Sequence, residues 1–143
     1  MKSLSMVLAL GLISTQAFAQ SPARMPVPAT VQEQFDLLYP EARKTRWSEQ
    51  EGMYAAHFRN QKHKTIIILD EAGTVKRIEA DIRVSALPKK ASAFLMEEAD
   101  AKRIRQATII APTDGEITFE ADISPAGEYV FDSDGELIAR REN

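Results

Sequence analysis

The feature that most limits how this chain can fold is a pattern that occurs twice, about sixty residues apart. Each copy opens with a short amphipathic helix, predicted at Val27-Pro28 and again at Leu87-Pro88, because proline fits the first turn of a helix. In the first copy, Val31, Phe35 and Leu38 follow the spacing of one helical face. Helices this short are marginal in isolation and need a sheet to cover.

Four strand-like segments follow each predicted helix. Their alternation of apolar and polar residues, as in Tyr54-x-Ala56-x-Phe58, indicates strands with one buried face. Turns rich in glycine and aspartate separate the segments and make successive strands neighbours. The sequence therefore predicts an α+β fold, in which two tandem helix-plus-antiparallel-meander repeats share a sheet of up to eight strands and both helices pack on one face. The expected strands span residues 42–48, 53–59, 64–70, 75–82, 103–111, 117–123, 128–132 and 137–140.

The start of the chain has the features of an export signal. Met1-Lys2 is followed by an apolar run at residues 4–13, which is far shorter than the ~20 residues that cross a bilayer. Ala17-Phe18-Ala19 is a small-x-small cleavage site, so the mature chain is expected to begin at Gln20 and to be periplasmic or secreted, without a membrane span. The predicted organisation is a signal peptide at residues 1–19, a polar lead at 20–25, a first repeat at 26–83 and a second repeat at 84–143, with the repeats forming one compact domain.

Composition and motifs exclude several classes of function. The chain has 18 Lys and Arg against 21 Asp and Glu, a net charge of −3 that argues against nucleic-acid binding. It has no cysteine, which excludes disulfides, thiol catalysis and thiolate zinc sites. The sequence also lacks the motifs of serine hydrolases, P-loop proteins, dinucleotide-binding proteins and zinc metalloproteases. No cofactor and no catalytic residue is expected.

A metal site is disfavoured as well. The histidines are His57 and His63, and lysines flank His63, where their ammonium groups would repel a cation. Residues 132–136 resemble the start of a calcium loop, but the glycine comes at the fourth position and strands flank the segment, so a hairpin turn is predicted. A small periplasmic enzyme of α+β sandwich fold, using carboxylates and His57 as acid and base, remains the alternative to a non-enzymatic protein.

The first copy contains the ordered pattern Val27-Pro28…Phe35…Tyr39-Pro40-x-Ala42…Trp47…Gly52-x-Tyr54-x-Ala56-x-Phe58…Asp70-x-x-Gly73. The second copy repeats part of it as Leu87-Pro88…Gly115…Asp132-x-x-Gly135, with Ala107 or Thr108 where the tryptophan would stand. From Val27 to about Ile138 the chain thus resembles the PepSY-like, beta-lactamase-inhibitor-like (BLIP-like) family of exported bacterial proteins. The resemblance implies an exported, non-enzymatic binding or inhibitory module, although a shared fold does not identify a partner.

One strand is apolar on both sides. Ile67 and Leu69 of this strand are predicted to face the helices, which turns Ile66 and Ile68 towards the open face of the sheet. Monomeric proteins rarely expose a large apolar patch, so this face is a candidate contact surface, unless a loop, the polar lead or the other repeat covers it. Met53 and Ala55 of the neighbouring strand are expected to join the patch. The corresponding positions of the second half are mostly polar: Glu116, Thr118, Glu120, Glu128, Val130 and Asp132.

Trp47 is the fifth candidate binding residue. It packs beneath the first helix, where an indole would bury a large area, or it lies on the open face as the anchor of an interface. Residues 26–83 hold nine basic and nine acidic residues, whereas residues 84–143 hold seven basic and twelve acidic residues. This difference would suit head-to-tail self-association as well as a protein or peptide partner in the cell envelope.

Overall fold

The structure is a computed structural model that describes residues 25–98 and 103–142. The expected signal peptide, its cleavage site and all of the polar lead except Met25 lie outside these residues. In chain order the elements are α1 (Ala29–Leu38), β1 (Arg46–Gln50), β2 (Met53–Asn60), β3 (His63–Leu69), β4 (Val75–Ile82), a 3-10 turn (Val84–Ala86), α2 (Lys89–Glu98), β5 (Ile104–Pro112), β6 (Thr118–Ile123), β7 (Gly127–Phe131) and β8 (Leu137–Arg141).

All eight predicted strands are present, and most of their bounds agree to within about two residues. The first strand is the exception, because it begins at Arg46 and not at residue 42. Lys44 lies in the left-handed region with a φ of 57°, which is incompatible with an extended strand. Residues 42–45 therefore form an irregular connection between the first helix and the sheet.

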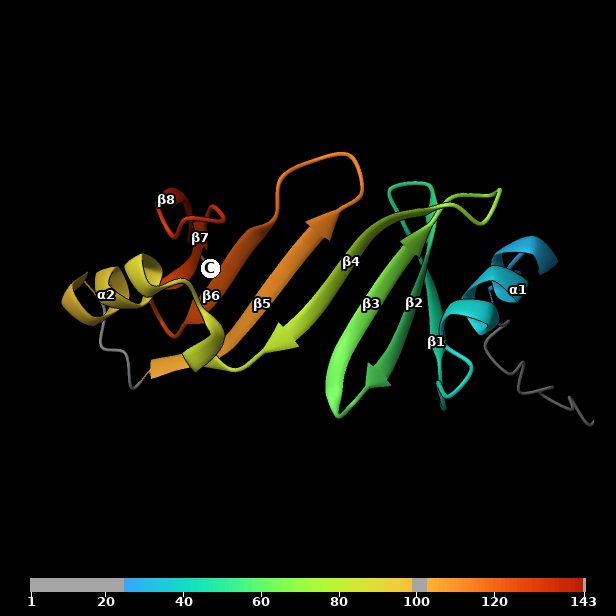
Figure 1. The fold of residues 1–143 in the computed structure, drawn as a ribbon, viewed down its shortest axis with the longest axis horizontal. Helices are drawn as coiled ribbons and strands as arrows, with labels where there is room; N and C mark the ends of the chain where they lie inside the picture. Colours follow the sequence, from blue (N-terminus) through green and yellow to red (C-terminus); the bar gives the residue numbers. More distant parts are fainter. Residues whose placement is uncertain (1–24, 99–102, 143) are drawn as a thin grey trace, which may run out of the picture.

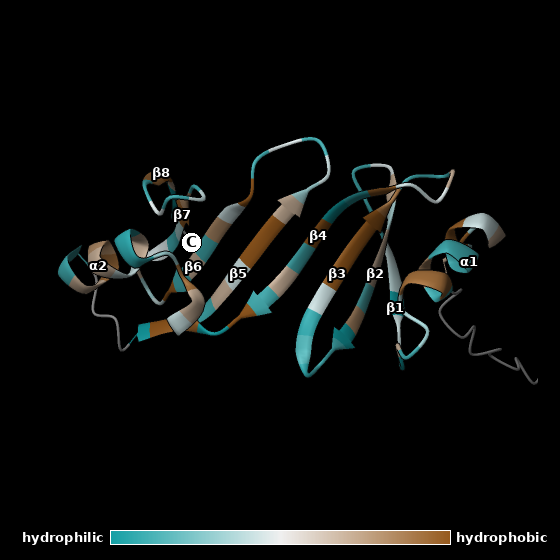
Figure 2. Ribbon diagram, in the orientation of Figure 1, coloured by the Kyte–Doolittle hydropathy of each residue, from teal (hydrophilic) through white to brown (hydrophobic). Residues whose placement is uncertain are grey.

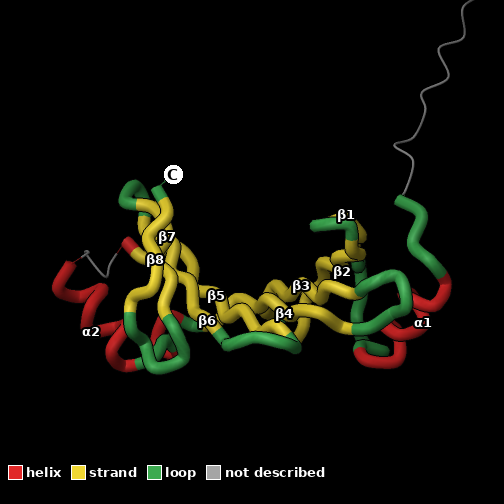
Figure 3. The backbone as a smooth tube through the Cα atoms, turned by 90° about the horizontal axis from the view of Figure 1, so that it is seen from above, coloured by secondary structure: helices red, strands yellow, loops and turns green. Residues whose placement is uncertain are grey.

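The eight strands form one antiparallel sheet whose spatial order is the same as the order along the chain (Figure 1). The register places Ala56 opposite Ile67, and Ile67 opposite Ile78. Figure 3 shows that β1 at one edge and β7–β8 at the other curve to the same side of the central strands. Both helices lie outside this curve, so the face of the sheet away from the helices is concave.

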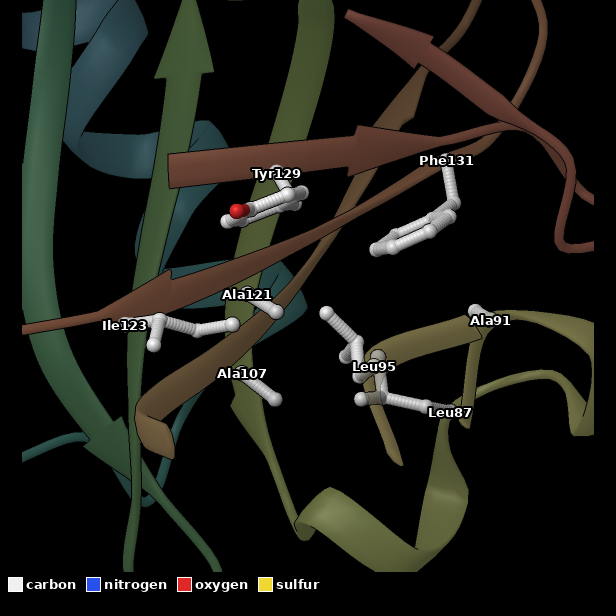
Figure 4. Close-up of a cluster of buried hydrophobic side chains, with 8 residues drawn as sticks. All are labelled: Leu87, Ala91, Leu95, Ala107, Ala121, Ile123, Tyr129 and Phe131. Atoms are coloured by element: carbon white, nitrogen blue, oxygen red, sulfur yellow. The ribbon is translucent and has the colours of Figure 1, made fainter. Parts of the chain in front are cut away.

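Each helix covers its own hydrophobic cluster on the convex side of the sheet. Ile67 and Leu69 are fully buried beneath α1, which confirms that they face the helices. Phe131 is fully buried beneath α2, and truncation of such a side chain to alanine typically costs roughly 3–5 kcal/mol. The cluster beneath α2 consists of Leu87, Ala91, Leu95, Ala107, Ala121, Ile123, Tyr129 and Phe131 (Figure 4).

The tight turns after β3 and β7 are built in the same way. Asp70 Oδ1 accepts the backbone N–H groups of Ala72 and Thr74 at 3.0 and 2.9 Å, and the hydrogen bond from Thr74 lowers the pKa of Asp70. Asp132 Oδ1 accepts those of Asp134 and Glu136 at 3.0 and 2.9 Å. This oxygen is therefore used by the turn, which confirms the prediction of a hairpin turn at residues 132–136.

In each of these turns a glycine allows the backbone to lie close to the helix of the same half. Gly73 and Gly135 have φ of +82° and +86°, a conformation that favours glycine. A Cβ at Gly73 would lie 3.0 Å from the carbonyl oxygen of Thr30 in α1, and one at Gly135 would lie 2.8 Å from the amide nitrogen of Ala91 in α2. The two turns thus fix the position of the first turn of each helix.

Candidate functional site

The concave face of the sheet contains a groove of about 770 Å³. Residues of β1 to β6 line it, and they are mostly the side chains that point away from the helices. Ile66 lies between His57 on β2 and Glu79 on β4 in the strand register, and Thr108 on β5 is opposite Glu120 on β6. Charged residues surround a small apolar centre.

The apolar patch expected on this face is only partly exposed. Met53 and Ile66 are half-buried, but Ala55 and Ile68 have 0% exposure, so the prediction of an exposed patch is wrong for these two. They are paired in register, and Arg77 on β4 lies opposite Ile68. The concave curvature brings neighbouring side chains over them, and the aliphatic stem of Arg77 lies beside Ile68.

Ion pairs hold the side chain of Arg77 on this face. Its Nε donates to Glu79 Oε1 at 2.9 Å, and its Nη1 lies 3.6 Å from Glu51 Oε2. The side chain of Arg77 is therefore held on the concave face, next to Ile68 in the register. A pattern of β-branched residues along one strand cannot reveal which neighbours stand beside it.

Trp47 lies on the other side of the sheet. Its ring packs edge-to-face on Phe35 of α1, with centroids 5.4 Å apart and an interplanar angle of 74°. It belongs to the cluster beneath α1 and also borders a shallow hollow between α1 and β1. Of the two alternatives for Trp47, the core position is therefore the observed one, and Trp47 does not join the open-face residues.

Basic side chains gather on the concave face of the first three strands. Arg46, Arg59 and Lys64 are exposed there and line the groove. Among the described residues, none of the three has a carboxylate oxygen within 4 Å; Arg59 donates to the carbonyl of Lys62 at 3.1 Å. These cations are available to a ligand.

Acidic side chains face them from β4 onwards. Glu79, Asp81 and Glu120 line the groove, and Asp81 Oδ1 accepts a hydrogen bond from Gln106 at 2.7 Å. The sequence predicts the acidic part of the open face in the second repeat, but Glu79 and Asp81 belong to the first. The boundary between the basic and acidic areas therefore runs between β3 and β4. The alternation of Glu79 and Asp81 with apolar residues along β4 was a signal that could have located them.

Glu120 also belongs to a hydrogen-bonded cluster with Arg141 and Glu128. Arg141 Nη1 donates to Glu120 Oε1 at 2.8 Å and to Glu128 Oε1 at 2.9 Å. A hydrogen bond with Glu120, together with burial and the charge of Glu120, raises the pKa of Glu128 to about 7, although Arg141 acts in the opposite direction. Glu128 therefore keeps its proton in mildly acidic solution. Asp122 lies opposite Glu128, and its buried Oδ1 has no hydrogen-bond partner among the described residues.

The possible acid–base residues do not converge. His57 Nε2 lies 2.8 Å from Ser48 Oγ, and in the described part of the chain no carboxylate hydrogen-bonds to this histidine. Ile66 separates His57 from Glu79, which puts the two backbones about two strand spacings, or roughly 9.5 Å, apart along the sheet. A catalytic base is normally oriented by a third group, and His57 has none of that kind within residues 25–98 and 103–142.

The described residues contain neither a candidate metal centre nor a membrane-spanning helix. No group of three or more His, Cys, Asp or Glu side chains there could hold a metal ion. None of the helices in that part of the chain is long and apolar enough to span a bilayer.

Comparison with solved structures finds the same architecture in proteins from Bacteroides. A protein from Bacteroides eggerthii that is classed as periplasmic matches with a TM-score of 0.74 and 18% identity, over 82% of this chain and 90% of that one. A DUF2874 family protein from Bacteroides uniformis matches with a TM-score of 0.71 and 22% identity, over 81% and 89% of the two chains. A BLIP-like protein from Bacteroides fragilis matches with a TM-score of 0.67 and 16% identity, over 82% and 87%.

The chain has the fold of these proteins. At such identities the likeness extends to the fold alone. No protein-family model matches the chain, and no curated protein sequence does.

Proposed function

We propose that this protein is an exported, non-enzymatic binding or inhibitory module that contacts another envelope protein or peptide through the concave face of its sheet. The observation that carries the proposal is the groove, which has an accessible apolar centre at Ile66 and charged residues on both sides. A polar rim around an apolar centre is the usual composition of a protein interface.

The alternative of a small enzyme is weaker. An enzyme needs convergent polar groups around a reacting atom, whereas His57 and the nearest groove carboxylate in its register row, Glu79, are separated by Ile66. The Ser48–His57 pair has no third orienting group among the described residues. Broad recognition of a partner therefore fits this face better than catalysis.

The proposal includes a place in the cell and an evolutionary origin. The cleavage site before Gln20 supports export, and one protein of the same fold is classed as periplasmic. We further propose that the chain is a duplication of a PepSY-like unit, with residues 26–83 and 84–143 as its two copies. The equivalent seating of Gly73 against α1 and Gly135 against α2 supports this origin.

The five candidate binding residues would then have different roles. Met53 and Ile66 are the apolar groups that a partner can reach. Ala55 and Ile68 are fully buried, so a partner cannot reach them and their role is to pack beside Met53 and Ile66. Trp47 acts from the opposite side, where it packs β1 onto α1 through Phe35.

Position-specific photo-crosslinking in the native cell envelope tests this function. A photoreactive residue replaces Ile66 on the concave face or, as the control, Leu37 on the outer side of α1, which is 76% exposed. We expect a discrete protein adduct from position 66 and none from position 37. Adducts of equal yield and identity from the two positions would contradict a binding role for the concave face.

A further inference from the structure

We propose that the groove selects an extended polypeptide segment that bears an acidic and a basic side chain four residues apart, with an apolar side chain midway between them. This inference rests on the proposed binding function and specifies the partner's chemistry. The acidic side chain would lie against the cations of β1 to β3, and the basic one against the carboxylates of β4 to β6.

The basic wall is a compact group of cations on neighbouring strands. Lys64 is opposite Arg59 in the register, and Arg46 is opposite His57, which places Arg46 diagonally from Arg59. Cross-strand neighbours on one face are within reach of the same ligand. Arginine can bind a carboxylate through two parallel N–H groups, so this wall suits an Asp or Glu side chain.

The acidic wall begins on the next strand. Asp81 and Glu79 project from β4, and Glu120 adds a third carboxylate on β6. The ion pair of Glu79 with Arg77 and that of Glu120 with Arg141 leave carboxylate lone pairs that can accept further hydrogen bonds. This wall suits a Lys or Arg side chain.

The strand spacing sets the distance between the two ligand charges. The row Arg46, His57, Ile66, Glu79 crosses four adjacent strands, or three spacings of about 4.8 Å, which makes roughly 14 Å. In an extended peptide, residues i and i+4 project to the same side about 13 Å apart, and residue i+2 projects between them. A segment of the form Glu-x-Leu-x-Lys laid across the strands would therefore match both walls. Its leucine would lie between His57 and Ile66, within about 3 Å of the position of Ile66 along the row.

The β2–β3 hairpin holds part of the basic wall in place under backbone strain. Its turn residues Gln61 and Lys62 have φ of 47° and 74°, a conformation that hairpin turns normally assign to Asn-Gly. The carbonyl of Lys62 accepts the hydrogen bond from Arg59. Non-glycine residues in this region often occur at functional sites, and here they flank two of the three cations. In Figure 2 this end of the hairpin is hydrophilic, whereas the other end of β3 is hydrophobic.

A peptide fits the groove better than a second copy of this chain. The edge strands β1 and β7–β8 curve towards the concave side (Figure 3), so two copies that face each other would make contact first at these edge strands and not at Ile66. A single extended segment is narrow enough to reach Ile66 on the floor. The opposite charges of the two walls also fix its direction across the strands.

Amide NMR titration of the exported, ¹⁵N-labelled protein tests the inference. The probe is acetyl-Ser-Glu-Thr-Leu-Thr-Lys-Ser-amide, compared with one peptide that has Gln at both charged positions and one that has Glu at both. We expect the Glu/Lys peptide to bind about tenfold more tightly than either control peptide, with shifts at Ile66 and Thr108. Lys64→Glu should weaken its binding about tenfold, whereas Lys89→Glu, the same exchange on an exposed residue of α2, should change it less than about twofold.

Equal affinities for the three peptides, or equal effects of the two substitutions, would overturn the charge rule. If the Gln peptide shifts Met53 and Ile66 and binds as tightly as the Glu/Lys peptide, the concave face remains a binding face and only the charge rule fails. If no peptide shifts any concave-face amide, the proposed function fails as well. Shifts of the same amides with protein concentration alone would identify a second copy as the occupant and would also overturn the inference.

Discussion

Replacing Glu128 by glutamine should stabilise the protein near pH 8 and leave its stability near pH 5 almost unchanged, within about 0.5 kcal/mol. The reason is the position of Glu128 next to Glu120, where a hydrogen bond with Glu120, burial and the charge of Glu120 raise the pKa of Glu128 from 4.5 to about 7. Between these two values the folded protein retains a proton that the unfolded chain has lost, so stability falls as pH rises. When the pH is above the folded-state pKa of about 7, the free energy of unfolding is lowered by the full cost of ionising Glu128.

The structure bounds the size of this effect. A rise in pKa from 4.5 to about 7 corresponds to at most roughly 3 kcal/mol. The side chain of Glu128 is 29% exposed, and screening by solvent reduces the expected cost to about 1–2 kcal/mol. Glutamine still donates a hydrogen bond to Glu120, and Arg141 keeps its ion pair with Glu120 at 2.8 Å. The variant should therefore gain about 1–2 kcal/mol near pH 8.

Urea unfolding followed by circular dichroism, at several values between about pH 5 and 8, measures the difference. The control is Glu97→Gln, which removes an exposed carboxylate of α2 and should give a difference that does not vary with pH. A gain for Glu128→Gln that is the same at both ends of the range would refute the raised pKa of Glu128 as its cause. A loss of stability near pH 8 would show that Glu128 stabilises the fold through Arg141 as a carboxylate.

Four further variants, in three experiments, test the fold. Ile67→Asp buries a charge beneath α1 and should unfold the protein, whereas Ile66→Asp on the half-buried concave side should cost less than about 1 kcal/mol; equal melting curves in circular dichroism would contradict this division of faces. Gln61→Asn combined with Lys62→Gly should raise the free energy of unfolding by about 1 kcal/mol in urea titrations, because the turn has positive φ at both positions, and a decrease would exclude strain there. Gly127→Ala should cost at least about 2 kcal/mol, because its φ is +101° and a Cβ would clash with a backbone carbonyl of β8; unchanged urea unfolding would contradict this packing.

Local sequence patterns were sufficient to predict most of the sheet. Alternating residues and aspartate–glycine turns are short-range signals, so the strands from β2 to β8 and the helix-facing positions Ile67 and Leu69 could be predicted. The start of β1 could not, because the left-handed conformation of Lys44 depends on how the chain leaves α1 and not on the identity of the residue.

The candidate site depends more on long-range structure. The burial of Ala55 and Ile68 depends on neighbours from other strands, because the register places the two residues side by side between β1 and β4. The side of the sheet on which Glu79 and Asp81 lie could have been predicted from alternation along β4. Their position next to the cations of β3 depends on the register between β3 and β4, which shifts between Ile68 and Leu69 and is not apparent from a single sequence.

The concave face also combines several features that reduce stability. Glu120 and Glu128 share a site that raises the pKa of Glu128, and the hairpin beside Arg59 has two non-glycine residues with positive φ. Glu128→Gln and a turn of Asn-Gly would remove these two unfavourable features. Features that lower stability without an evident structural benefit are expected at functional sites. The two areas of charge differ in how far their charges are compensated. In the acidic area, Arg77 pairs with Glu79 and Arg141 pairs with Glu120. Arg46, Arg59 and Lys64 have no carboxylate oxygen within 4 Å among the described residues, so the charge of the basic area, which the strained hairpin adjoins, remains open to a partner.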